Sequence, residues 1–183
     1  MIPHTSSVLT PPPLPTQLYL EVVNRCNSLC TTCPLTFGPH ESAHSLRWDE
    51  FLQITDQFPA LERVVLHGIG EPLMNPELPR MIRHLKERGA YVLFNSNAIL
   101  LNGRRVDALI ESGLDEIRVS IDGATPETYF KLRGVKAFPK VLGNIRRFVE
   151  RQRALGTDRP RVSFWMTGTR ENIAELPFLI NVA

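Results

Sequence analysis

The feature that most constrains this chain is a loop of three closely spaced cysteines. Cys26, Cys30 and Cys33 lie within eight residues in the pattern CxxxCxxC, and the 183-residue chain has no other cysteine. A strand-like apolar run over residues 18–23 leads directly into this loop. Three thiolates on one short loop can hold three irons of a cubane iron–sulfur cluster. The spacing therefore indicates a [4Fe–4S] cluster whose fourth iron is open to another ligand.

Other uses of three cysteines fit the sequence less well. A disulfide framework needs an even number of cysteines and a secreted context, and the sequence indicates neither. Zinc is the more serious alternative, because His40 or His44 could complete a Cys₃His tetrahedron. Zinc loops more often carry CxxC pairs at both ends. We therefore favour the cluster, and keep a zinc-stabilised binding module without catalysis as the alternative.

The hydrophobic pattern predicts strands that alternate with helices. Short apolar runs predict strands at residues 18–23, 63–67, 91–94, 116–121 and 161–166. Apolar residues at helical spacing predict helices at residues 45–58, 76–88, 104–112 and 138–155, a short helix from Thr125-Pro126, and a last helix from about Leu176. Such alternation implies parallel strands joined by right-handed crossovers. The predicted fold class is α/β, with about five strand–helix units in an open parallel sheet or a partial (β/α) barrel.

Polar residues and glycines recur where these strands end. They share a position at or just after the end of a predicted strand: Gly68, Gly70 and Glu71 follow the second, Asn95 and Asn97 the third, and Ser120 and Asp122 the fourth. The cysteine loop follows the first strand in the same way. Ligand sites in parallel α/β folds lie at the carboxyl ends of the strands. The sequence therefore predicts one site on this rim.

The turn after the second strand has a chemical interpretation of its own. Glycine has no side chain, so Gly68 and Gly70 would let the backbone approach a ligand closely. Carbonyl groups in this turn could accept hydrogen bonds from an ammonium group, and Glu71 could add charge to them. A plain tight turn before a helix is the alternative. His67, just before the turn, is interpreted as a structural residue, because buried histidines are commonly just hydrogen-bonded.

These motifs together resemble the radical S-adenosylmethionine (radical SAM) superfamily. The resemblance rests on CxxxCxxC after a first strand, on the flanking Glu21–Arg25, Asn27 and Pro34, and on the sequence GIGEP at Gly68–Pro72. It implies a partial barrel, a [4Fe–4S] cluster and S-adenosylmethionine (SAM) chelated by the open iron. It further implies reductive cleavage of SAM to a 5′-deoxyadenosyl radical, which abstracts hydrogen from a substrate. Many members carry an aromatic residue where this chain has Thr32.

The resemblance also implies which residues hold the cofactors. Cys26, Cys30 and Cys33 would ligate the cluster. The GIGEP turn is similar to the family's GxGEP motif, which grips the amino group of SAM, and thus implies contacts from Gly68, Gly70, Glu71 and Pro72.

Residues after the fourth strand complete the implied SAM site. Ser120 and Arg133, in the sequence Ser-x-Asp-Gly followed by Arg-Gly, are similar to members that hold the SAM carboxylate with these residues. Asn97 and Asp122 are candidates for the ribose hydroxyls. The implied partners are an electron donor, such as a flavodoxin or ferredoxin, and a substrate that the sequence does not identify.

Composition and length set the remaining expectations. Residues 1–16 are rich in proline and predict a flexible arm, and residues 17–183 predict the radical SAM core. The net charge of +2 gives no clear signal for nucleic acid. There is no membrane-length apolar run and no export signal, and oxygen damages such clusters, so we expect a cytoplasmic protein. The sequence ends before a sixth strand, so we expect a fragment or a truncated frame; a truncated, inactive remnant is a further alternative to the enzyme.

Overall fold

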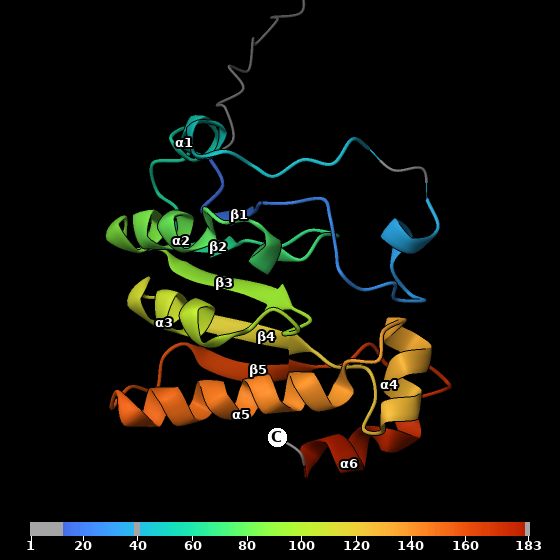
Figure 1. The fold of residues 1–183 in the computed structure, drawn as a ribbon. Helices are drawn as coiled ribbons and strands as arrows, with labels where there is room; N and C mark the ends of the chain where they lie inside the picture. Colours follow the sequence, from blue (N-terminus) through green and yellow to red (C-terminus); the bar gives the residue numbers. More distant parts are fainter. Residues whose placement is uncertain (1–12, 39–40, 182–183) are drawn as a thin grey trace, which may run out of the picture.

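A five-stranded parallel sheet forms the centre of the computed structural model, which describes residues 13–38 and 41–181 (Figure 1). The strands lie in the order of the sequence: β1 (Gln17–Tyr19), β2 (Arg63–Val65), β3 (Tyr91–Ser96), β4 (Glu116–Ser120) and β5 (Arg161–Trp165). The helices are α1 (Trp48–Thr55), α2 (Leu78–Glu87), α3 (Gly103–Glu111), α4 (Pro126–Arg133), α5 (Phe138–Ala154) and α6 (Leu176–Ile180), with short 3₁₀ turns η1 (Pro34–Thr36), η2 (Pro72–Met74) and η3 (Ile173–Glu175). The predicted α/β class with parallel strands is confirmed.

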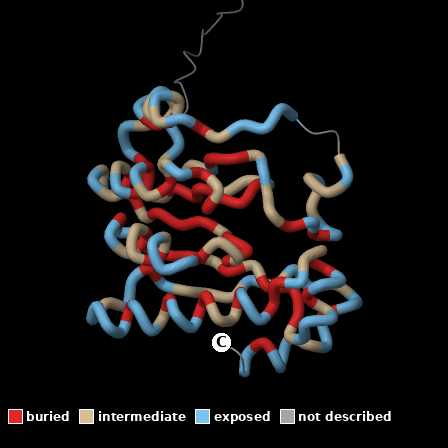
Figure 2. Tube along the Cα trace, viewed as in Figure 1, coloured by how far each residue is buried: buried red, intermediate tan, exposed pale blue. Residues whose placement is uncertain are grey.

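The main core lies between the sheet and the helices α2, α3 and α5, which cover one of its faces (Figure 1). Leu66, Phe94 and Ile117 point into this core and are fully buried. Successive residues of a strand point to opposite faces, so Val65 and Leu93 are buried outside this cluster. Buried residues are concentrated in the strands, whereas the helices keep exposed outer faces (Figure 2). The sheet is thus fixed by apolar packing mainly from one side.

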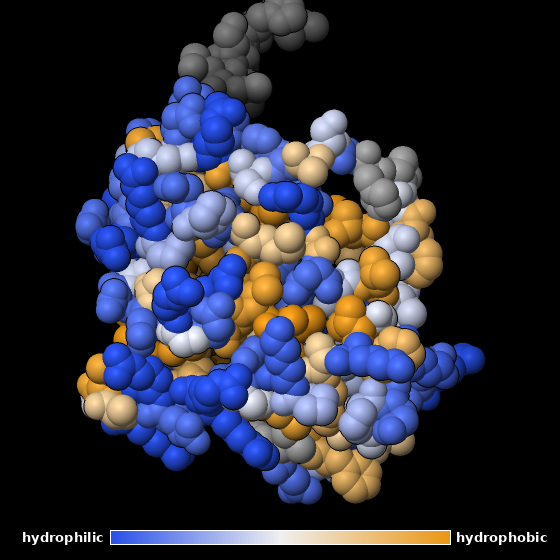
Figure 3. Space-filling model, viewed as in Figure 1, coloured by the Kyte–Doolittle hydropathy of each residue, from blue (hydrophilic) through white to orange (hydrophobic). Residues whose placement is uncertain are grey.

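Several element boundaries follow the sequence prediction closely. Gly89 and Gly113 follow the last turns of α2 and α3 with φ of 83° and 78°, in the left-handed region that favours glycine. Thr125 caps α4, because its hydroxyl accepts a hydrogen bond from the Thr128 amide at 3.2 Å. The last helix, α6, begins at Leu176 as predicted. It leaves Phe178 and Ile180 exposed, and Figure 3 shows a hydrophobic area there.

Several predicted boundaries were wrong. The first helix, predicted over residues 45–58, spans only Trp48–Thr55, because Ser45 pairs with Val23 in an isolated bridge before the helix begins. The first strand is much shorter than residues 18–23, because the chain leaves the sheet after the Leu20 amide bonds the Val65 carbonyl at 2.9 Å. The second helix starts at Leu78, whereas the sequence predicted an Asn75 cap with the helix from residue 76. The Asn75 side-chain oxygen still accepts from the Glu77 amide at 2.9 Å, as in a cap, and its buried amide group also donates to the carbonyls of Val22 at 2.8 Å and Leu46 at 3.0 Å. This side chain therefore joins distant backbone segments.

The sequence analysis also expected a flexible arm at residues 1–16 and no membrane-spanning segment. The proline-rich arm lies outside the described residues up to residue 12, and the described residues 13–16 have no regular structure. Within the described part of the chain, no helix combines the length and the apolar character needed to cross a membrane.

Candidate cofactor-binding site

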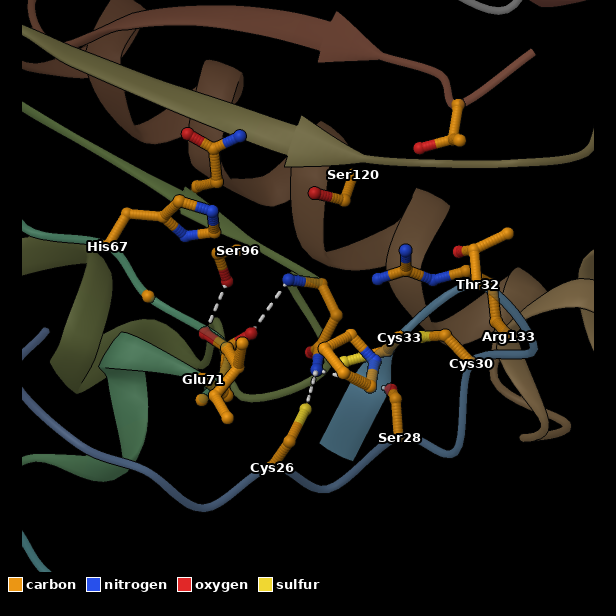
Figure 4. A pocket seen from close by; sticks show the side chains of 17 residues that line it. Cys26, Ser28, Cys30, Thr32, Cys33, His67, Glu71, Ser96, Ser120 and Arg133 are labelled. Atoms are coloured by element: carbon orange, nitrogen blue, oxygen red, sulfur yellow. Dashed lines mark hydrogen bonds between the residues drawn. The ribbon is translucent and has the colours of Figure 1, made fainter. Parts of the chain in front are cut away.

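A cavity of about 320 Å³ opens at the carboxyl ends of the strands (Figure 4). Segments that follow each of the five strands contribute to its wall. Nine of the predicted site residues line it: Cys26, Cys30, Cys33, Gly68, Gly70, Glu71, Asn97, Ser120 and Arg133. The structure therefore brings the cysteine loop and the polar strand ends together in one site. The predicted Pro72 and Asp122 do not line the cavity.

The cysteine loop is held in shape by its own backbone and by Asn97, which directly follows β3. None of the three cysteines forms a disulfide, and Cys30 is buried. The Cys33 amide donates to the Cys30 carbonyl at 3.1 Å, and the Thr36 hydroxyl donates to the same carbonyl at 2.8 Å. The Asn97 side-chain amide lies 3.8 Å from the Cys26 sulfur. Burial raises the pKa of the Cys26 and Cys30 thiols.

Helix α4 forms the other support of this loop. The Leu29 amide donates to the Arg133 carbonyl at 3.2 Å, and the Thr31 amide donates to the Leu132 carbonyl at 2.9 Å. Gly134 ends α4 with φ of 68°, and a Cβ atom at this position would overlap the Leu29 carbonyl. A glycine is therefore required here both by the backbone conformation and by close packing on the loop.

The donor set fits a cluster better than a single ion. In the described residues, no group of three or more His, Cys, Asp or Glu side chains is placed to hold one metal ion. A cubane spreads its thiolates over separate irons, so three sulfurs around one cavity suit it. Of the predicted zinc ligands, His44 bonds Glu50 at 3.1 Å and lies outside the cavity wall, and His40 lies outside the described residues. These contacts give the zinc interpretation no support.

The glycine turn after β2 packs closely on protein. A Cβ atom on Gly70 would overlap the Val23 carbonyl, and one on Gly68 would overlap the Glu21 side chain. The Glu21 carboxylate accepts hydrogen bonds from the Ile69 amide at 2.6 Å and from the Gly70 amide at 3.2 Å. From the sequence, both glycines were interpreted as letting a ligand approach the backbone. The structure adds a second reason, which is the approach of the chain between β1 and the cysteine loop.

Glu71 is almost fully buried, and its carboxylate is bound by protein donors. It accepts hydrogen bonds from the Ser96 hydroxyl at 2.7 Å, the Asn97 amide at 2.8 Å and the Leu73 amide at 3.3 Å. Burial raises its pKa, and these donors oppose the rise. Glu71 therefore joins the turn after β2 to the end of β3. A direct contact with the ammonium group of SAM stays a prediction.

Asp122 lies behind Arg133 and orients it. The Arg133 Nη1 atom donates to Asp122 Oδ2 at 2.9 Å, and the Thr167 amide donates to Asp122 Oδ1 at 2.8 Å. Both carboxylate oxygens are thus engaged by protein, and the predicted contact of Asp122 with ribose stays untested. Ser120 and Arg133 share the cavity wall, as expected for two residues that bind one carboxylate.

The sequence prediction missed some of the cavity wall. Thr167 follows β5 and lines the cavity. The strand-end rule would have found it had it been applied to the fifth strand as well. Ser28, inside the cysteine loop, and Ser96, between Asn95 and Asn97, also line the cavity, although the sequence prediction gave neither a role. His67, interpreted as structural, lies at the wall with its pKa lowered by burial.

The fold and the site together define a class of protein. This is a parallel α/β protein that presents a three-cysteine loop and a polar cavity at the carboxyl ends of its strands. The family model for the radical SAM superfamily matches residues 20–182 of the sequence. The chain therefore belongs to this superfamily. The superfamily's cofactors are a [4Fe–4S] cluster and S-adenosylmethionine. The recognition made from the sequence is confirmed.

Individual relatives show how much of a longer protein the chain resembles. It is 30% identical over 167 residues to the tungsten-containing aldehyde ferredoxin oxidoreductase cofactor-modifying protein of Pyrococcus furiosus, covering 88% of this chain and 46% of that protein. It is 32% identical over 125 residues to the PqqA peptide cyclase of Ruegeria pomeroyi, covering 68% and 33%. The chain therefore spans less than half the length of these curated relatives.

A solved structure extends the comparison to the fold. Streptococcus suis SuiB bound to S-adenosylmethionine has a TM-score of 0.66 and 20% identity, covering 92% of this chain and 38% of SuiB. At this identity the likeness concerns the fold alone.

Proposed function

We propose that this chain is the cofactor-binding core of a radical SAM enzyme. Cys26, Cys30 and Cys33 bind the [4Fe–4S] cluster, and the cavity beside them binds SAM. When bound, the reduced cluster and SAM supply a carbon radical that abstracts hydrogen from a substrate. The observation that carries this proposal is the convergence of three thiols and the polar strand ends on one cavity.

The cavity wall offers complementary groups to the two charged ends of SAM. Arg133 presents a guanidinium group, which suits a carboxylate, and Ser120 adds a hydroxyl donor. The turn Gly68–Pro72 presents backbone groups to the amino end, with Glu71 fixing the shape of the turn. Asn97 directly follows β3 and lines the cavity, and its side-chain amide donates to Asn27 in the cysteine loop at 2.7 Å; we propose that it also contacts the ribose.

Turnover needs one electron from outside the chain. We propose a flavodoxin or ferredoxin as the one-electron donor, because the cysteine loop supplies ligands but no reductant. The substrate is proposed only as a molecule that presents an abstractable hydrogen at the mouth of the cavity. The named relatives act on different targets, one of them a peptide cyclase.

Anaerobic reconstitution with iron and sulfide tests the proposal directly. The wild-type protein should turn brown and hold about four irons per chain, whereas Cys30→Ala should lose the cluster. The variant Ser42→Ala, at an exposed position away from the cavity, is the matched control and should retain full iron. A colourless wild-type protein with one zinc would instead establish the binding-module alternative. Release of 5′-deoxyadenosine with dithionite separates an active core from an inactive remnant.

A further inference from the structure

Buried polar atoms without a partner mark places where the fold lacks an acceptor or a donor. Among the described residues there are four such side-chain atoms: His67 Nδ1, His84 Nε2, Tyr129 Oη and Arg133 Nε. The last two belong to one helix, α4, whose end supports the cysteine loop. Two orphaned groups in one place call for a common explanation, because leaving a buried donor unpaired costs free energy.

Tyr129 is the more unusual of the two residues. Its side chain is fully buried, and its ring packs against Phe138 with centroids 5.4 Å apart. Burial raises the pKa of Tyr129 to about 12; the nearby Arg133 opposes the rise, and the Cys30 sulfur adds to it. Arg133 carries only donors, so it cannot accept the Tyr129 hydroxyl proton. Of the acceptors whose charge acts on Tyr129, the Asp122 carboxylate is already engaged by Arg133 and Thr167, which leaves the Cys30 sulfur.

Arg133 likewise has a buried donor group that lacks an acceptor. Its Nη1 atom is taken by Asp122, whereas its Nε–H group has no acceptor and the residue is 9% exposed. Figure 4 shows Arg133 beside Cys30 at one end of the cavity, and the Cys30 sulfur is among the charges that raise the pKa of Arg133. Asp122 and the backbone contacts of α4 hold the guanidinium group in this place.

We propose that Tyr129 and Arg133 donate hydrogen bonds to the Cys30 sulfur when it binds iron, and so raise the reduction potential of the cluster. The inference rests on the proposed function, since it needs the cluster to be bound. Hydrogen bonds to the sulfurs are one of the factors that set the potential of iron–sulfur clusters. Donors aimed at a ligand sulfur stabilise the more negative, reduced state. Tyr129 lies outside the cavity wall, so it acts on the cluster from the protein side.

Redox titration of reconstituted Tyr129→Phe, followed by EPR of the reduced cluster, tests this assignment. The variant should keep its iron and show a lower midpoint potential. A tenfold change in the equilibrium constant for reduction, which is about 59 mV for one electron, is the expected size. Tyr91→Phe is the matched control, because the Tyr91 hydroxyl donates to Glu116 at 3.2 Å and lies outside the cavity wall. Its potential should equal that of the wild type.

The stability of the metal-free protein gives a second readout. Phenylalanine removes the orphaned hydroxyl, so metal-free Tyr129→Phe should resist urea at least as well as metal-free wild type. Once the cluster is bound, the wild type should resist urea better than Tyr129→Phe. Full iron with an unmoved potential in Tyr129→Phe would overturn the inference while leaving the proposed function intact. Loss of iron would show a structural role instead, and a wild type that binds no cluster would overturn both.

Discussion

Replacing Glu116 with glutamine removes the charge from the centre of a polar cluster that ties β3, β4 and β5 together. The buried carboxylate accepts hydrogen bonds from the Tyr91 hydroxyl at 3.2 Å, Arg118 Nε at 3.0 Å and Ser163 Oγ at 3.0 Å. It also forms an ion pair with Arg161 at 3.0 Å. In the part of the chain that the structure describes, β5 is the outermost strand beside β4, and these contacts secure it there.

The size of the effect follows from the protonation of Glu116. Burial raises its pKa, but the bonds from Arg118, Arg161 and Ser163 lower it more, to about 2 against an ordinary value of 4.5. A difference of roughly 2.5 in pKa corresponds to about 3.4 kcal/mol. Arg161 is 67% exposed, so solvent screens its share, and glutamine keeps one acceptor. We therefore expect Glu116→Gln to lose about 2 kcal/mol at pH 7, or about 4–8 °C in melting temperature.

Urea unfolding of the metal-free protein at several pH values measures this loss. A folded pKa below the unfolded value gives stability that is present above pH 4.5 and is lost as the pH falls towards 2. The difference in the free energy of unfolding between wild type and Glu116→Gln should therefore disappear as the pH falls below 4.5. Glu111→Gln, at an exposed site on α3, should show no gap. A gap that persists at low pH, or none at pH 7, would refute the reasoning.

Two further predictions concern the site. Arg133→Ala should weaken SAM binding while leaving the iron content of the reconstituted protein nearly unchanged; equal affinity by calorimetry would remove Arg133 from the SAM site. Gly134→Ala should lose about 1–2 kcal/mol from its left-handed backbone, and should also lower the iron content, because its Cβ would overlap the Leu29 carbonyl. Gly156→Ala is its control, with φ of 66° and open space around it, so it should share the stability loss and keep the iron.

The sequence predicted those parts of the fold that depend on local signals. Alternating apolar runs and helical stripes are read within a short window, and they were sufficient for the order and type of every main element. Gly89 and Gly113 end helices because a left-handed residue is a local requirement. The cysteine loop and the polar strand ends could also be placed on one rim, because parallel strands point their carboxyl ends the same way.

Contacts between distant segments lay beyond sequence reasoning. Asn75 accepts from the Glu77 amide as a cap does, but its amide group also bonds Val22 and Leu46, far away in the chain, and this could not be foreseen. Glu71 and Asp122 look like ligand-binding acids, yet their oxygens are engaged by Ser96, by backbone amides and by Arg133. Which partner a polar side chain finds depends on the packed fold, and its type alone does not determine it.

The hydrogen bond from the Thr31 amide to the Leu132 carbonyl has a consequence for biosynthesis. These residues are 101 positions apart, so the ribosome makes the thiols long before the helix that braces them. A nascent chain that stops short of Gly134 would carry the three thiols on a segment that lacks this support. Delivery of iron and sulfide should therefore follow translation of this region, when β1 to β4 have already been made.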